Sequence, residues 1–326
     1  PSPKAIRAFE KNKNNLSRYP DDDSQDLRDK IAQTFNDIYE LKKIDPRRII
    51  CGAGSDQIFD LICKVFLTHK DEVIVNQFGF IMHRIYASLH KAKIRFAKEK
   101  NFKASGEEIL KKVTQKTKIV FIANPNNPTG TYLSKNEILD LRLKLRSNIL
   151  LVIDDAYAEF MTKDDFSSGL ELFKLNTNVL ITRTFSKIYG LAGMRVGYSV
   201  SSPVIADLLN RVRQPFNVNS FGLAAASLAL DDTEFVAESR RLNAQGRDRI
   251  CADVSNLGLE YIPSRGNFVC VNLARPATSV FESMLKQGVI VRPVANYGLP
   301  NHLRVTVGLP DENEKMIAAL TIALAS

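Results

Sequence analysis

The segment TRTFSKIYGLAGMRVGY, residues 182–198, contains the residues with the clearest chemical potential. Lys187 follows the hydroxyl of Ser186, lies just after an apolar run and precedes Arg195 by eight positions. A lysine amine in this setting can act as a Schiff-base nucleophile, and the hydroxyl and guanidinium can hold a phosphate group. Taken alone, the segment more often indicates a solvated lysine in a loop.

Two further segments place polar side chains directly after apolar runs. ANPNNPTG, residues 123–130, fixes Asn127 in a turn between two prolines, and VIDDAYAEF, residues 152–160, offers Asp154 and Tyr157. A carboxylate at the end of a buried strand needs a partner, and a protonated heterocyclic nitrogen would serve. The alternatives are a rigid turn without a ligand and an aspartate that caps the next turn.

A fourth segment, ICGAGSDQ at residues 50–57, predicts a strand, a glycine-rich turn and the start of a helix at Ser55 and Asp56. Free backbone N–H groups at a helix start favour a phosphate. Together the four segments predict a lysine, a carboxylate, an amide, a tyrosine hydroxyl and a phosphate site at one edge of a sheet. Pyridoxal phosphate requires that set of groups.

Short runs rich in Ile and Val alternate with helical patterns through the first two-thirds of the chain. The predicted strands, most of them buried on both faces, are residues 48–51, 73–75, 94–97, 119–123, 149–153, 179–182 and 196–200. The predicted helices are residues 55–67, 81–90, 105–113 and 134–145, the last two with capping pairs Ser105/Glu108 and Ser134/Glu137. We therefore predict an α/β fold with a mostly parallel, seven-stranded sheet covered by helices.

The pattern changes after about residue 225. It predicts a long helix at 233–257, a strand at 268–273, a helix at 277–287, strands at 289–292 and 303–307, and a final helix at 312–325. This divides the chain into a large cofactor-binding domain at 1–226, with a remnant of an N-terminal arm at 1–20, and a smaller C-terminal α/β domain at 227–326. Because the chain opens on Pro1, we expect a preceding segment.

Composition favours a globular protein over a disordered or membrane-spanning one. The 326 residues are 44% hydrophobic and 25% charged, which is typical of a globular protein. The net charge of +9 is spread over scattered lysines, and no apolar run reaches the roughly 18 residues of a membrane span, so we expect neither nucleic acid nor membrane as a partner. Four distant cysteines favour a reducing compartment, here the cytoplasm. The sequence has four histidines, His69, His83, His90 and His302, and their spacing is not that of metal ligands. We expect them at helix ends or in loops, and His83 is the one that could line a pocket.

These motifs resemble the fold-type-I pyridoxal-phosphate aminotransferases, and within them the histidinol-phosphate aminotransferases of the class II family. The resemblance covers nearly the whole chain and also includes RYPD, RQPFNVNS, PSRGNFV, GVIVRPVANYGLP and HLRVTVG. It implies Lys187 as the Schiff-base lysine and acid/base, with Asp154 on the pyridine nitrogen and Asn127 and Tyr157 on the ring oxygen. The residues implied to hold the cofactor phosphate are Ser55, Asp56, Ser186 and Arg195.

The resemblance also implies roles for residues outside these motifs. Phe78 falls near the position of the family's aromatic ring on the cofactor. Tyr19 matches a tyrosine that reaches the partner's site in a homodimer. Arg304, with Arg292 beside it, matches the substrate arginine, and one guanidinium site would serve both the carboxylate of glutamate and the phosphate of histidinol phosphate. No metal is expected.

The implied activity is transamination between L-histidinol phosphate and 2-oxoglutarate, giving imidazole-acetol phosphate and glutamate, in histidine biosynthesis. Three alternatives remain at this point. An aromatic aminotransferase for Tyr or Phe, or dual activity, would use the same scaffold. A phosphothreonine decarboxylase is a close relative, and a cofactor-binding regulator is disfavoured because Lys187, Asp154 and Asn127 are all present.

Overall fold

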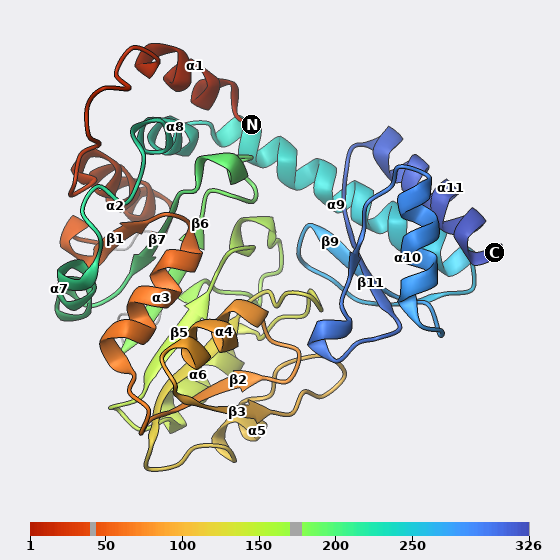
Figure 1. Ribbon diagram of the computed structural model, residues 1–326, viewed down its shortest axis with the longest axis horizontal. Helices are drawn as coiled ribbons and strands as arrows, with labels where there is room; N and C mark the ends of the chain where they lie inside the picture. The colour runs from red at the N-terminus through yellow and green to blue at the C-terminus, as the bar shows by residue number, and fades with distance from the viewer. Residues whose placement is uncertain (40–43, 170–177, 326) are drawn as a thin grey trace.

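The computed structural model describes residues 1–39, 44–169 and 178–325, and these residues form two sheets (Figure 1). The larger sheet has seven strands in the order β1-β7-β6-β5-β4-β2-β3, and only β7 runs antiparallel to its neighbours. The strands are β1 (Ile49–Gly52), β2 (Glu72–Asn76), β3 (Lys93–Ala97), β4 (Thr117–Ala123), β5 (Leu150–Asp154), β6 (Val179–Thr184) and β7 (Gly197–Val200). The prediction of a mostly parallel, seven-stranded sheet is confirmed.

Helices cover both faces of this sheet, so its strands are buried on both sides. In β5, Leu151 and Ile153 belong to one apolar cluster, whereas Leu150 and Val152 belong to another. The first cluster includes residues of α1 (Pro3–Asn12), α2 (Gln25–Tyr39), α5 (Gly106–Leu110), α6 (Lys135–Lys144) and α8 (Ser220–Leu230). The second includes residues of α3 (Ser55–Phe66), α4 (Ile81–Leu89) and α7 (Pro203–Val212). Only β3, at the edge of the sheet, has mostly exposed or half-buried residues.

The two predicted capping pairs differ in the structure. Ser134 and Glu137 form a complete capping box at the start of α6. Ser105 accepts a hydrogen bond from the backbone N–H of Glu108, but the Glu108 carboxylate pairs with Lys111 at 2.8 Å. The helix that begins there ends at Leu110 rather than at residue 113.

The first residues form a packed helix rather than an extended arm. Ser2 caps α1, whose Ala5 and Ala8 are buried, and α1 lies along α8 (Figure 1). These two helices, together with α2 and α7, were not predicted. The packing of α1 depends on contacts between residues more than 200 positions apart, such as those with α8 and the hydrogen bond from Ser2 to Asp232.

The second sheet has four strands in the order β10-β11-β9-β8 and packs against α9, α10 and α11. Its strands are β8 (Glu260–Ile262), β9 (Phe268–Asn272), β10 (Arg292–Pro293) and β11 (His302–Thr306), and its helices are α9 (Thr233–Asn256), α10 (Ala277–Lys286) and α11 (Pro310–Ala325). The long helix α9 runs from beside α8 to this sheet and joins the two parts of the molecule (Figure 1).

The strand predicted at 289–292 is wrong in its bounds, because β10 begins only at Arg292. The backbone N–H of Val289 donates to Met284 at the end of α10, and Gly288 adopts a left-handed φ of 78°. Because the Val289 N–H is used to close the helix, it is not available for a hydrogen bond to a neighbouring strand.

Strand register decides where the polar residues of the large sheet meet. Ala123 of β4 pairs with Asp154 of β5, and Asp154 pairs with Thr182 of β6. The carboxyl ends of these parallel strands therefore lie at one edge, where ligands of open α/β sheets bind. Among the described residues, no helix is both long and apolar enough to cross a membrane.

Candidate active site

A cavity of about 370 Å³ lies at this edge of the large sheet. Its lining combines the segments after β1, β4, β5 and β6 with residues of β10, β11 and the short helix η5 (Ala295–Tyr297) that connects them. All the predicted site residues line it except Phe78 and Tyr19; those that do are Ser55, Asp56, Asn127, Asp154, Tyr157, Ser186, Lys187, Arg195, Arg292 and Arg304.

Asp154 is buried at the end of β5 with its carboxylate held in one orientation. Its Oδ1 accepts hydrogen bonds from the Thr182 hydroxyl and the Ala156 backbone N–H, both at 3.2 Å. The other oxygen, Oδ2, lies 3.5 Å from Nε2 of His83. Since two donors already hold Oδ1, Oδ2 is the oxygen left for a ligand with an N–H group.

His83 is a site residue that the sequence analysis undervalued. It lies in the first turn of α4 and is almost fully buried, with its ring stacked on Phe121 at 4.8 Å and edge-on to Phe59 at 4.7 Å. The only available sequence signal was its place three residues after the aromatic Phe80. Of the other histidines, His90 ends α4 as expected, whereas His302 lies within β11.

Lys187 lies in the turn after β6, with its Nζ 5.5 Å from the centre of the Tyr157 ring. Burial lowers the pKa of Lys187, and the nearby Arg304 guanidinium lowers it further, against the opposing effect of Asp154. A lowered pKa increases the share of neutral amine near pH 7, and the neutral amine is the form that acts as nucleophile or base.

Tyr157 and Asn127 line the cavity from neighbouring strand ends. The Tyr157 ring packs edge-on to Phe268 at 5.2 Å, and burial raises the pKa of its phenol, which therefore remains a hydrogen-bond donor. Asn127 Oδ1 accepts a hydrogen bond from Arg304 Nη1 at 2.6 Å. Arg304 also lies over the Phe268 ring, at 5.1 Å, so that its guanidinium is held from two sides.

An anion site lies at the start of α3. Gly54 precedes this helix with a φ of 80°, and a Cβ at that position would lie 2.5 Å from Nη2 of Arg195. Arg195 donates to the Ser186 hydroxyl at 3.3 Å, and no side chain caps the first N–H groups of α3. Free N–H groups, a hydroxyl and a guanidinium together favour a phosphate.

The role of Asp56 in this anion site differs from that of its neighbours. Its carboxylate lies 3.6 Å from Arg195 Nη2, and burial raises its pKa. Because a carboxylate that has lost its proton only accepts hydrogen bonds, Asp56 can serve an anion only through its backbone N–H. Its side chain instead helps to position the guanidinium of Arg195.

Phe78 does not line the cavity, whereas Phe80 does. The Phe78 ring lies 5.7 Å from Phe102, in an apolar cluster with residues of the small sheet, and its backbone N–H donates to Glu99 at 3.0 Å. Of these two aromatic residues, Phe80 is therefore the one at the wall of this cavity.

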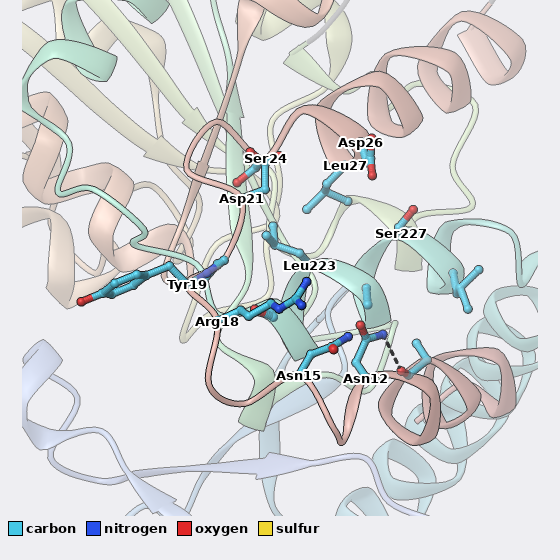
Figure 2. Close-up of a pocket in the computed structure, with 15 residues that line it drawn as sticks. Asn12, Asn15, Arg18, Tyr19, Asp21, Ser24, Asp26, Leu27, Leu223 and Ser227 are labelled. Atoms are coloured by element: carbon cyan, nitrogen blue, oxygen red, sulfur yellow. Dashed lines mark hydrogen bonds between the residues drawn. The ribbon is translucent and has the colours of Figure 1, made fainter.

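Tyr19 is also outside the cavity of its own chain. Tyr19 borders a separate cavity beside α1, α2 and α8, with its ring directed away from the other lining residues (Figure 2). The residue is 82% exposed and its ring stacks on Phe216 at 4.7 Å. The following segment is anchored, because Asp22 accepts hydrogen bonds from Arg213 at 3.1 Å and from the Phe216 N–H at 2.8 Å. Nothing within this chain uses the Tyr19 hydroxyl among the contacts of the described residues.

Throughout residues 1–39, 44–169 and 178–325, no three His, Cys, Asp or Glu side chains lie together as a metal site would require. The cavity itself holds a lysine amine, a fixed carboxylate and a set of anion-binding groups.

Comparison with known proteins gives one family. The model of the family described as aminotransferase class I and II matches residues 1–320. Histidinol-phosphate aminotransferase 2 of Pseudomonas fluorescens is 43% identical over 324 residues, which cover 99% of this chain and 86% of that protein. Histidinol-phosphate aminotransferase of Pelagibacter ubique is 45% identical over 323 residues, which cover 98% and 88%.

A solved structure extends the similarity to the fold. Histidinol-phosphate aminotransferase from Sinorhizobium meliloti, in complex with pyridoxal-5'-phosphate, superposes with a TM-score of 0.93 at 26% identity. The superposition covers 100% of this chain and 88% of that one. Both sheets and the cavity between them therefore lie within the shared architecture.

Proposed function

The chain belongs to the aminotransferase class I and II family, and from this premise we propose that it is a pyridoxal-phosphate-dependent histidinol-phosphate aminotransferase. The reaction moves the amino group between L-histidinol phosphate and 2-oxoglutarate, giving imidazole-acetol phosphate and glutamate, in histidine biosynthesis. The observation that carries the proposal is that Lys187, Asp154 and Arg195 line one cavity together with Arg304 and Arg292. The names of relatives that are 43% and 45% identical support the choice of substrate.

The cavity residues fit pyridoxal phosphate. Asp154 has one carboxylate oxygen held by two donors and the other left for a protonated ring nitrogen. The turn at Gly54 has no room for a side chain beside Arg195, so the guanidinium lies close to the backbone at the start of α3, where the phosphate would bind. Phe80 lines the cavity as an aromatic surface for the pyridine ring.

When bound, pyridoxal phosphate supplies a protonated pyridine ring that withdraws electrons from the substrate carbon. Asp154 keeps the proton on the ring nitrogen, because a buried carboxylate favours a positive charge at hydrogen-bond distance. The Tyr157 phenol, protonated because burial raises its pKa, donates to the ring oxygen together with the Asn127 amide. These three residues orient the ring and set its charge.

Lys187 would act as the general acid and base. Its neutral Nζ would take the proton from the substrate carbon that bears the amino group, hold it, and release it later in the same proton shift. Burial and Arg304 lower the pKa of Lys187, which favours the neutral amine that this transfer needs.

Arg304 and Arg292 bind the anionic end of each substrate. The two residues pair directly across β10 and β11, and both line the cavity. A guanidinium accepts either a carboxylate or a phosphate, so glutamate and histidinol phosphate can use one site in turn.

The second candidate is an aromatic aminotransferase, alone or with dual activity. Apolar and aromatic side chains form much of the cavity lining, and such a surface would hold a phenyl ring as well as an imidazole; they are Phe80, Ile81, Met82, Tyr157 and Tyr297. The two candidates differ in whether a phosphate is required.

Half-reaction rates separate these candidates. The enzyme loaded with pyridoxal phosphate is mixed with L-histidinol phosphate or with L-phenylalanine, and the absorbance of the bound cofactor is followed. We expect L-histidinol phosphate to react at least about tenfold faster, since a hydrogen bond to a charged group contributes roughly 1.5–3 kcal/mol. Comparable rates would favour dual or aromatic activity, and no reaction with either donor would favour a binding protein.

We further propose a homodimer in which Tyr19 reaches the cofactor phosphate of the partner subunit. The exposed Tyr19 ring is stacked on Phe216, and the segment that follows is fixed by Asp22 and Arg213. An aromatic pair held rigidly at the surface is suited to a protein contact.

Mixed dimers test this arrangement. Tyr19→Ala should lower activity about tenfold or more through loss of a hydrogen bond to a charged group, and Lys187→Ala should be inactive. In a mixture of the two variants, each mixed dimer has one site with an intact Lys187 that receives Tyr19 from its partner. Activity in the mixture should therefore exceed that of either variant alone. Activity no higher than the diluted Tyr19→Ala enzyme would place Tyr19 in its own subunit's site.

Two broader assignments complete the proposal. We assign residues 1–226 to the large cofactor-binding domain and 227–326 to the small domain. We place the enzyme in the cytoplasm, where small biosynthetic substrates and four unpaired cysteines are expected together.

A further inference from the structure

Tyr297 lines the active-site cavity together with Arg292 and Arg304, but neither the sequence motifs nor the mechanism above gives it a role. It ends η5, between β10 and β11, and its backbone N–H donates to Val294 at 3.0 Å. Its ring packs against a buried cluster that contains Val294 and Leu299. The phenol is therefore held in one place at the cavity wall.

Among the hydrogen bonds of the described residues, none engages the Tyr297 hydroxyl. The backbone N–H of Ile81, the first residue of α4, is near enough to influence the pKa of this phenol, and the N-cap Phe80 offers no side-chain cap. Arg84 of α4 donates to the Asn296 carbonyl at 2.6 Å and so holds α4 beside the segment that carries Tyr297. In the part of the chain that the structure describes, no acceptor is found for the phenolic proton.

The electrostatic setting keeps that proton in place. Burial raises the pKa of Tyr297, and this outweighs the opposing effects of the Ile81 N–H and of the neighbouring arginines, Arg304, Arg292 and Arg84. A phenol that remains protonated can donate one hydrogen bond into the cavity. The wall beside the two guanidinium groups thus also offers a neutral O–H donor.

We propose that Tyr297 donates its phenolic hydrogen bond to the phosphate of the amino donor and thereby selects a phosphate over a carboxylate. This rests on the proposed function. The two oxygens of a carboxylate are satisfied by one guanidinium fork, whereas a phosphate monoester has three terminal oxygens. Arg304 serves two of these oxygens, and Tyr297 with Arg292 serves the third.

The test is Tyr297→Phe, which keeps the ring and removes only the hydroxyl. Half-reactions of the loaded enzyme are measured with three donors: L-histidinol phosphate, L-histidinol and L-glutamate. We expect kcat/KM for L-histidinol phosphate to fall about 10- to 100-fold, the loss that accompanies a missing hydrogen bond to a charged group. The values for the two donors without phosphate should change less than about threefold. Tyr261→Phe, in β8 of the small sheet and outside the cavity lining, is the matched control and should leave all three rates unchanged.

Other outcomes are informative in distinct ways. An equal loss with all three donors would mean that the hydroxyl only positions α4, and it would overturn the proposal; so would no loss with L-histidinol phosphate. The wild-type enzyme tests the underlying function separately. If it does not prefer L-histidinol phosphate over L-histidinol, the proposed function fails before any variant is compared.

Discussion

Replacing Lys187 by alanine should lower the rate of transamination by at least about a thousandfold, because one residue supplies both the nucleophile and the proton transfer. The variant should still fold and bind pyridoxal phosphate, since Arg195, Ser186 and the start of α3 remain in place. The rate is measured with saturating L-histidinol phosphate and 2-oxoglutarate. Cofactor retention is measured by absorbance after gel filtration.

Lys70→Ala is the control for this experiment. Lys70 is exposed in the turn between α3 and β2, and surface changes of this kind usually alter stability by less than about 0.5 kcal/mol. Its activity and thermal midpoint should match those of the wild type. If Lys187→Ala kept more than a tenth of wild-type activity while folded, the lysine would not be the catalytic group.

Asp154→Asn should lower kcat about 100- to 1000-fold, a loss comparable to that of a preorganised electrostatic partner. The amide oxygen can still accept from Thr182 and Ala156, so the side chain should keep its orientation. Its NH₂ group, however, would face the ring nitrogen as a donor and disfavour the protonated ring. The cofactor dissociation constant, measured by titration, should change much less than kcat.

His83→Phe provides a graded comparison for Asp154→Asn. The new ring can fill the space between Phe59 and Phe121 but lacks the nitrogen that lies 3.5 Å from Asp154. We expect a smaller loss in kcat, about tenfold or less, because His83 contacts the charged carboxylate of Asp154 but does not itself contact the ring nitrogen. If Asp154→Asn weakened cofactor binding as strongly as catalysis, the carboxylate would act mainly as an anchor.

The strands of the large sheet were predictable because they are short apolar runs between helical segments, and a strand buried on both faces needs no alternation. The same pattern located Lys187, Asp154 and Asn127, since each follows such a run and parallel strands end at one edge. Helix α8 was not predictable in this way, because its residues, such as Ala226, are small and apolar nearly all round and give little apolar periodicity. Helix α1 does have its apolar residues, among them Ala5, on one face, and this pattern was missed in the sequence.

Within the site, the direction in which a side chain points could not be predicted from the sequence. Phe78 and Phe80 are two residues apart in a turn, and only the start of α4 at Ile81 decides which ring meets the cavity. His83 was undervalued for a related reason. Its partner Asp154 lies 71 positions later in the chain. A contact between the start of a helix and the end of a distant strand leaves no pattern in the sequence around either residue.

The two sheets supply different halves of the cavity. The ends of the large sheet carry Lys187 and Asp154, which every amino donor would need under the proposed function. The β10–β11 hairpin carries Arg292, Tyr297 and Arg304, which would meet the variable end of the substrate. Substrate preference can therefore change through this hairpin, provided that Arg304 is kept, because Arg304 also donates to Asn127 and lowers the pKa of Lys187. The stretch between Arg292 and Arg304 is thus the natural segment for engineering a different amino donor.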